Sequence, residues 1–263
     1  MNVAGRTVLV TGATGGLGHA IARRLRAAGA ELVLTGRRVD ALEALAAETG
    51  AYTVAVDLAD PAAVDGLARA CEDVDILVAS AGLPASGQVT SFSVEEIDRA
   101  LAVNLRAPMI LSRHLVERMV ARGQGHLVFM SSLSGKVGPP RASVYAATKF
   151  GLRGFAQSLR EDLHARGVGV SAIFPGFVRD AGMYHDAGVE VPPWVGTSAP
   201  EDVADAVLQA IERNRGEIDV APLSMRAGAK IAGLAPDVAA SVQRRLGGER
   251  IAEQHVTGQT DKR

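Results

Sequence analysis

Short apolar runs alternate with helical stripes of apolar residues along residues 5–220 of the chain. The apolar runs are rich in Val, Ile and Leu, and we expect most of them to be strands buried on both faces. Helical stripes separate the runs; Leu17, Ile21 and Leu25, for example, recur at every fourth position. The expected strands are 7–10, 32–34, 54–57, 76–79, 126–130, 168–174 and 217–220.

This alternation predicts one α/β domain over residues 1–223. Parallel strands joined through a helix need right-handed crossovers, so the helices should cover both faces of a doubly wound, mostly parallel, seven-stranded sheet. No internal repeat or linker interrupts the pattern. Three of the expected helices are 39–48, 61–70 and 199–213.

A further helical stripe predicts a C-terminal extension over residues 224–263. We expect Pro236 to divide it into two helices, and the polar residues 258–263 to be frayed. The stripe should pack on the core or on a neighbouring copy in a homodimer or homotetramer; the alternative is a helix lying on a membrane surface. It consists of Ala227, Ile231, Leu234, Val238, Val242 and Leu246.

Composition excludes several classes of function. The net charge of the 263 residues is −1, so nothing in the charge indicates a nucleic acid partner. One cysteine, Cys71, cannot form an internal disulfide, and no metal-ligand cluster surrounds it, which fits a reducing compartment. The N-terminus leads directly into a strand, and no apolar run is long enough to cross a bilayer. We therefore expect a cytoplasmic protein without a metal.

A glycine-rich turn follows the first expected strand and precedes a helix. Gly12, Gly15, Gly16 and Gly18 have the spacing G-x-x-x-G-x-G with one added glycine. Strand, glycine turn and helix is the arrangement that brings backbone N–H groups and a helix N-terminus to a pyrophosphate. The alternative is a tight turn without a ligand.

Two residues in the helix after the fifth strand can carry acid/base chemistry. Tyr145 and Lys149 are four positions apart, so a helix places them on one face. An ammonium beside a phenol favours the phenolate and should lower the tyrosine pKa toward neutrality, which suits a general acid. Ser132, at the end of the fifth strand, lies thirteen residues before Tyr145 and can reach the same reacting oxygen. The alternative is a solvated pair on a helix surface.

Together with Asn104 and with Pro175-Gly176 after the sixth strand, these motifs closely resemble the short-chain dehydrogenase/reductase family, in its short branch with a single Rossmann-like domain. The resemblance implies hydride transfer between a nicotinamide cofactor and a carbonyl or alcohol. Tyr145 would be the acid/base, Lys149 would support it and bind the nicotinamide ribose, Ser132 would hold the substrate oxygen, and Asn104 would anchor a water.

The resemblance also implies the cofactor contacts, with Asp57 and Leu58 at the adenine. They are Gly12, Thr14, Gly15, Gly16, Leu17, Gly18, Arg37, Asp57, Leu58, Ala81, Gly82, Asn104, Tyr145, Lys149, Pro175, Gly176 and Val178.

The end of the second strand predicts NADP(H) in preference to NAD(H). NAD-specific proteins place an acid there for the ribose 2′-hydroxyl, but this chain has Gly36. Arg37 follows and can grip a 2′-phosphate, with Arg38 in reserve. Gly15 stands where many NADP-specific relatives have a second basic residue, so the expected preference is moderate.

The chain departs from the family pattern at two places. Ala79-Ser80 replaces the usual pair of asparagines before Ala81-Gly82, which puts local stability and ribose contacts in doubt. Asp180 stands where the family often has a threonine that contacts the cofactor, so Asp180 is not counted as a site residue.

Residues 177–198 should cover the substrate as a lid. Their apolar side chains, including Met183 and Trp194, favour a small apolar ketone, aldehyde or alcohol, although both side chains fit core packing equally well. Two other functions stay open. One is a nucleotide-binding sensor or scaffold without turnover, and the other is an isomerase or dehydratase of nucleotide sugars.

Overall fold

A computed structural model describes residues 1–188, 195–245, 252–253 and 256–259. Seven strands form one sheet in the order β3-β2-β1-β4-β5-β6-β7, and every pair of neighbours is parallel. The strands are β1 (Thr7–Thr11), β2 (Glu31–Gly36), β3 (Tyr52–Ala55), β4 (Ile76–Ala79), β5 (Gly125–Met130), β6 (Val168–Pro175) and β7 (Glu217–Val220).

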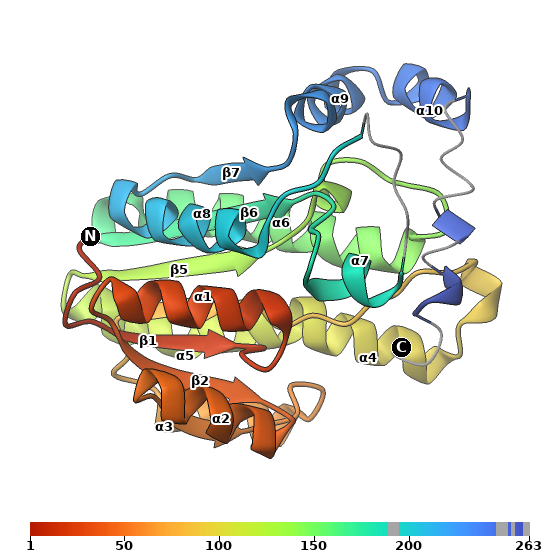
Figure 1. Cartoon of the computed structure of the whole chain (residues 1–263). Helices are drawn as coiled ribbons and strands as arrows, with labels where there is room; N and C mark the ends of the chain where they lie inside the picture. The colour runs from red at the N-terminus through yellow and green to blue at the C-terminus, as the bar shows by residue number, and fades with distance from the viewer. Residues whose placement is uncertain (189–194, 246–251, 254–255, 260–263) are drawn as a thin grey trace.

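Helices cover both faces of the sheet, as Figure 1 shows. Ile21, Leu42 and Val207, from the helices of one face, share a core cluster; Val64, Leu111 and Leu152 belong to the cluster of the other. On the first face lie α1 (Gly16–Ala27), α2 (Val39–Thr49) and α8 (Pro200–Arg213), and on the second α3 (Pro61–Ala70), α5 (Ala107–Ala121) and α6 (Ser143–Leu163). This arrangement confirms the predicted doubly wound α/β class.

The remaining helices lie around the carboxyl ends of the strands (Figure 1). Ser93 and Glu96 form a capping box at the start of α4, with both hydrogen bonds present. These helices are α4 (Val94–Leu101), a π-helical segment (Ala102–Arg106), α7 (Gly182–Asp186), α9 (Leu223–Leu234) and α10 (Pro236–Arg245). Short 3-10 turns occur at Val89–Ser91, Leu133–Gly135 and His164–Arg166.

The order of strands reverses at β1, which lies between β2 and β4. The chain leaves β1 for β2 on one side and returns to β4 on the other, so the connections at the carboxyl ends part there. Crevices at such points bind ligands in open α/β sheets. The glycine turn after β1 and Gly82 after β4 therefore border the same crevice.

Two expected boundaries are wrong by a few residues. β3 ends at Ala55, so Asp57 lies beyond the strand, and Val56 makes the last hydrogen bond to Gly36. β2 extends to Gly36 rather than ending at Leu34 because its register continues along β1 and β3.

The C-terminal stripe forms the two predicted helices, but its described large side chains do not pack on the core of the chain. Pro236 begins α10, as expected. Ile231, Leu234 and Val238 are 53%, 89% and 58% exposed. The prediction that these side chains pack on the core of the chain is therefore wrong. The face of α9 with Ala229 turns inward instead, because small side chains allow close packing there. Leu246 and Trp194 lie outside the described residues, as does the side chain of Val242.

Candidate active site

The glycine turn after β1 leaves no room for side chains at three positions. Gly12 has a φ of 68°, and a Cβ atom there would lie 2.6 Å from the Cα of Ala81. A Cβ at Gly16 would lie 2.5 Å from the Cβ of Ala181, and one at Gly18 would overlap the carbonyl of Gly12. Because α1 begins at Gly16, its first N–H groups have no partner in the helix itself. The turn therefore has the geometry of a pyrophosphate cradle.

Thr11 holds the segment after β4 against this turn. Its buried hydroxyl accepts a hydrogen bond of 3.1 Å from the N–H of Ala81, while Ala79 stays paired in β4 and Ser80 bonds to Val78. These bonds replace part of what the usual asparagines would supply, so the departure at Ala79-Ser80 leaves the segment anchored. A Cβ at Gly82 would lie 3.5 Å from Asn104 Oδ1 and 3.7 Å from Lys149 Nζ.

The carboxyl end of β2 is closed by Thr14. A Cβ atom at Gly36 would lie 2.9 Å from both the Oγ1 and the Cγ2 of Thr14, so an acidic side chain at this position would clash with Thr14. Arg38 donates a hydrogen bond to the carbonyl oxygen of Thr14. Arg37 is exposed beside it. Two guanidinium groups therefore border the crevice where the sequence predicts a 2′-phosphate.

Asp57 and Leu58 lie at the turn that follows β3. Burial opposes ionisation of Asp57, but the N–H of Ala59 and the guanidinium of Arg99, whose hydrogen bonds are both 3.0 Å, hold its pKa below the ordinary value. Leu58 is buried in the core cluster of the second face. Asp57 is thus an ionised, fixed acceptor at the edge of the predicted adenine site.

Asn104 lies in the π-helical segment between α4 and α5 and is buried. Such single-turn insertions are common at functional sites, because they re-aim one side chain without ending the helix. The Asn104 amide bonds to the backbone of Leu83 and, at 3.4 Å, to the hydroxyl of Thr148. The residue therefore fixes the chain beside Gly82.

Ser132, Tyr145 and Lys149 are brought together where α6 packs on the end of β5. Ser132 follows β5 directly, and its side chain hydrogen-bonds the phenol of Tyr145 and accepts from the N–H of Ser134. Lys149 Nζ lies 5.5 Å from the centre of the Tyr145 ring and donates 2.9 Å to the carbonyl oxygen of Met130. The hydroxyls of Ser132 and Tyr145 are therefore in direct contact, with the ammonium of Lys149 close to the phenol ring.

Burial dominates the protonation of this group. It raises the pKa of Tyr145 to about 12, against the opposing hydrogen bond with Ser132, and lowers the pKa of Lys149 to about 8. The expected lowering of the tyrosine pKa by the ammonium is therefore wrong for this state. A phenolate at this buried position would lose its hydration, and the ammonium of Lys149 donates its hydrogen bond to Met130 rather than to the phenol. In this structure Tyr145 carries its proton at neutral pH, as a general acid for reduction must.

Pro175, Gly176 and Val178 lead from β6 into the lid. Pro175 ends β6, and a Cβ at Gly176 would lie 2.9 Å from the Cβ of Ala221 and 3.2 Å from the Cε of Met225. Val178 pairs with Ser198 in a short bridge that closes the base of the lid. Leu17, at the start of α1, faces Gly182 of α7. The lid thus meets the cradle through its first turn.

Three further residues support the site, and of these the sequence predicted only Met183, as an apolar side chain of the lid. The hydroxyl of Thr148 donates 2.7 Å to the carbonyl of Tyr145, and the hydroxyl of Ser131 donates 3.1 Å to the carbonyl of Lys149. The thioether methyl of Met183 would lie 3.3 Å from a Cβ at Gly82. Thr148, between the two catalytic candidates, was visible in the sequence; the other two contacts depend on how the lid and β5 pack.

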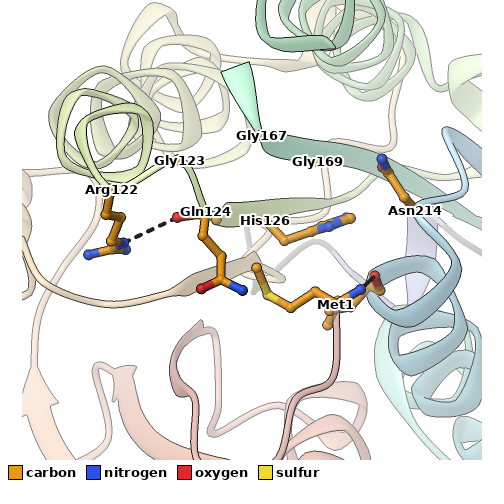
Figure 2. A pocket seen from close by; sticks show the side chains of 10 residues that line it. Met1, Arg122, Gly123, Gln124, His126, Gly167, Gly169 and Asn214 are labelled. Atoms are coloured by element: carbon orange, nitrogen blue, oxygen red, sulfur yellow. Dashed lines mark hydrogen bonds between the residues drawn. The ribbon is translucent and has the colours of Figure 1, made fainter. Parts of the chain in front are cut away.

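A separate cavity of about 360 Å³ opens at the opposite edge of the sheet, between the starts of β5 and β6 (Figure 2). His126 and Asn214 line it, and His126 Nε2 is 2.8 Å from the hydroxyl of Ser171. Burial lowers the pKa of His126 to about 3, so the ring is neutral. None of the predicted site residues lines this cavity.

No group of three or more potential metal ligands occurs within the described part of the chain. Across the same residues, no helix is both long enough and apolar enough to pass through a bilayer. Cys71 is buried and unpaired, and burial raises its pKa, as expected for an unreactive core thiol.

Comparison with known proteins gives the same family from sequence and from structure. The sequence pattern of the family described as short chain dehydrogenase matches residues 6–191. The ketoacyl reductase HetN of Nostoc sp. (strain PCC 7120 / SAG 25.82 / UTEX 2576) is 36% identical over 225 residues, which are 82% of this chain and 78% of the relative.

Two further relatives extend over nearly their whole length. The 3-oxoacyl-[acyl-carrier-protein] reductase FabG of Rickettsia prowazekii (strain Madrid E) is 31% identical over 236 residues, 87% of this chain and 98% of that protein. A short-chain dehydrogenase from Sphingobium yanoikuyae, solved in complex with NADPH, superimposes with a TM-score of 0.76 at 30% identity and covers 88% of this chain and 96% of its own.

Proposed function

The chain belongs to the short-chain dehydrogenase/reductase family, and from this premise we propose that it is an NADP(H)-dependent oxidoreductase. Its reaction interconverts a carbonyl group and a primary or secondary alcohol on a small apolar substrate. The observation that carries the proposal is the convergence of two hydroxyls, from Ser132 and Tyr145, in front of a buried lysine.

Each of these three side chains has a separate task. Tyr145 gives its proton to the carbonyl oxygen in reduction and takes one from the alcohol in oxidation. Ser132 holds the same oxygen through its hydroxyl, which also bonds Tyr145. Lys149 keeps a positive charge close to the phenol, and its bond to Met130 uses one of three N–H donors, which leaves two for a ribose.

The residues of the crevice fit a dinucleotide. The glycine turn with the N-terminus of α1 would hold the pyrophosphate, Asp57 the adenine end, and Lys149 with Asn104 the nicotinamide end. When bound, the nicotinamide supplies or accepts a hydride. Tyr145, Ser132 and Lys149 provide the proton transfer and the orientation.

Support for NADP(H) over NAD(H) comes from the end of β2. Thr14 fills the space in which a carboxylate at position 36 would have to sit, so nothing acidic repels a 2′-phosphate there. Arg37 makes no hydrogen bond or ion pair within the described residues, and its charge helps to hold the pKa of Asp57 below the ordinary value, whereas Arg38 already bonds the cradle. The relative from Sphingobium yanoikuyae was solved with NADPH, which agrees with this choice.

Support for a carbonyl substrate comes from the relatives and from the lid. HetN and FabG are named as ketoacyl and oxoacyl reductases, enzymes that act on a ketone. The described lid brings Met183 over Gly82, and Met225 of α9 lies behind Gly176, so apolar side chains border the reacting groups on two sides. These contacts favour an apolar substrate body.

We also propose that residues 1–223 form the catalytic domain and that the extension 224–263 contributes to assembly into a homodimer or homotetramer. The outward stripe of α9, with Ile231 53% and Leu234 89% exposed, is the surface that supports this proposal. An anionic membrane is the alternative occupant, since Arg226 and Lys230 flank the stripe. A cytoplasmic location stays a prediction from composition.

The test is a cofactor assay against a panel of apolar ketones, aldehydes and alcohols with NADPH, NADH, NADP and NAD. We expect turnover of at least one carbonyl or alcohol with the phosphorylated cofactor. Binding of NADPH without turnover of any panel member would favour the sensor or scaffold. Ile231→Glu with Leu234→Glu, measured by solution mass and by vesicle binding, separates assembly from membrane contact.

A further inference from the structure

The C-terminal tail, meaning the described residues 252–253 and 256–259, lies against the lid (Figure 1). The side-chain N–H of Gln259 donates 2.9 Å to the carbonyl oxygen of Met183 in α7. Gly258 touches the next part of the lid so closely that a Cβ atom there would overlap the carbonyl of Ala187. Gln259 is only 3% exposed, so this contact is part of the packed structure.

The same tail is tied to the other wall of the site. Glu253 forms an ion pair of 2.7 Å with Arg141, which lies four residues before Tyr145 in the loop that leads into α6. Arg141 has a φ of 55°, and its carbonyl oxygen accepts from the N–H of Gly87. The tail therefore connects the lid with the loop in front of the catalytic helix.

The segment of the lid that the tail holds rests directly on the predicted cofactor cradle. Ala181 packs on Gly16, Gly182 on Leu17, and the methyl of Met183 on Gly82. A dinucleotide that follows the cradle has to move the first turn of α7 outward. A contact that holds α7 in place from outside must slow this outward movement, and with it both the entry and the release of the nucleotide.

We propose that the tail is a latch that fastens α7 over the nucleotide cradle and closes the outer side of the substrate site. Gln259 is its positioning residue, acting through the carbonyl of Met183, and the pair of Glu253 with Arg141 anchors it. The latch sets how fast the cofactor exchanges and how large a substrate fits under the lid. This assignment rests on the proposed oxidoreductase function.

The Gln259 side chain has one more feature that fits this role. Its Oε1 is buried and has no hydrogen-bond partner within the described residues. Buried acceptors are nearly always satisfied, so this oxygen is open to a donor that enters with a bound molecule or a water.

The first experiment compares Gly258→Ala with Gly228→Ala. The added methyl overlaps the carbonyl of Ala187 in the first variant and meets nothing in the second, which is the matched control. Stopped-flow fluorescence gives the rates of NADPH binding and release. We expect both rates to rise in Gly258→Ala and in Gln259→Ala, by about 2- to 13-fold for the loss of one hydrogen bond. Unchanged rates in both variants would overturn the latch.

The second experiment reverses the anchoring charges. Arg141→Glu and Glu253→Arg should each raise KM and admit longer substrates with little change in kcat, and the double reversal should restore the wild-type KM. A double variant no better than its parents would show that the ion pair anchors nothing.

Hydrogen exchange of residues 181–187 tests the latch independently of the proposed oxidoreductase function, because the measurement needs neither cofactor nor turnover. Faster exchange in Gly258→Ala than in Gly228→Ala supports the latch even if no panel substrate reacts. Equal exchange in the two variants refutes it even if the enzyme is active.

Discussion

Asn104 and the backbone of Leu83 form a two-way pair. The Oδ1 of Asn104 accepts from the N–H of Leu83 at 2.7 Å, and its Nδ2 donates to the carbonyl oxygen of the same residue at 3.0 Å. One amide thus satisfies both backbone polar groups of Leu83, the buried residue directly after Gly82. The resemblance implies that Asn104 anchors a water, which stays a prediction; its observed side-chain contacts are with the backbone of Leu83 and the hydroxyl of Thr148.

Replacing Asn104 should therefore affect both stability and activity. Asn104→Ala leaves the N–H and C=O of Leu83 without their partner, and we expect a loss of about 2 kcal/mol in the free energy of unfolding. Asn104→Asp keeps an acceptor for the N–H but faces the carbonyl with another oxygen, so it should also lose activity. Urea denaturation and kcat/KM measure the two effects. An alanine variant with wild-type stability would contradict the pairing.

Tyr145→Phe should abolish turnover while nucleotide binding persists. The phenol supplies the proton, and its loss leaves Ser132 alone at the substrate oxygen. Lys149→Ala should reduce both turnover and cofactor affinity, since the ammonium serves both. Steady-state kinetics and NADPH titration separate the two variants. If Tyr145→Phe kept more than about a tenth of the wild-type kcat, a loss below about 1.4 kcal/mol, another group would be the acid.

Activity should decline as the pH rises through about 8, the pKa to which burial lowers Lys149. Above that value the side chain is neutral and no longer supports the phenolate or binds the ribose as a cation. The pH profile of kcat/KM measures this limb. Lys149→Arg is the control, because a guanidinium stays charged over the whole range. An identical limb in any active arginine variant would assign the titration to another group.

Lys149 should also oppose folding. Its native pKa of about 8 is below the ordinary 10.5, so the unfolded chain binds the proton more tightly than the folded one. The loss in the free energy of unfolding caused by Lys149 is greatest below pH 8 and disappears as the pH rises to about 10.5. Lys149 therefore makes stability increase with pH across that window.

Lys149→Met is expected to be more stable than the wild type at pH 7. Removing the buried charge gains about 3 kcal/mol, and losing the bond to Met130 returns part of it, for a net gain of about 1 to 2 kcal/mol. Denaturant unfolding at pH 7 and pH 10 measures the difference, which should shrink at the higher pH. A variant less stable than the wild type at pH 7 would mean that the buried lysine does not lower the free energy of unfolding.

The sequence predicted the sheet and the grouping of Tyr145 with Lys149 because local signals determine both. Apolar runs identify β1, β4, β5 and β6, and the spacing of Tyr145 and Lys149 places them on one helical face. The protonation of that pair was mispredicted because the pKa depends on burial by distant segments. The latch residue Gln259 and the contact of Met183 with Gly82 join segments far apart in the chain, and no local pattern indicates them.

The same limit applies to the stripe of α9. Its helical period was correctly predicted, but the period alone does not say which face turns inward. Ala229 and Ala232 are buried, whereas the larger Ile231 and Leu234 are exposed. Small residues allow α9 to pack against the core cluster of the second face, which leaves the larger side chains exposed.

The last prediction is the choice of NADP(H) over NAD(H), and it depends on Arg37. A charge-assisted bond from a guanidinium to the 2′-phosphate is worth about 1.5 to 3 kcal/mol, or a preference of roughly 10- to 150-fold in kcat/KM. Arg37→Ala should erase most of this preference by raising KM for NADPH and leaving NADH unchanged. Arg38→Ala is the matched control. It frees the carbonyl of Thr14 and should weaken both cofactors together, because the bond it removes shapes the cradle rather than the phosphate site. Equal or better kcat/KM with NADH in the wild type would refute the assignment and leave Arg37 as a solvated residue at the start of α2.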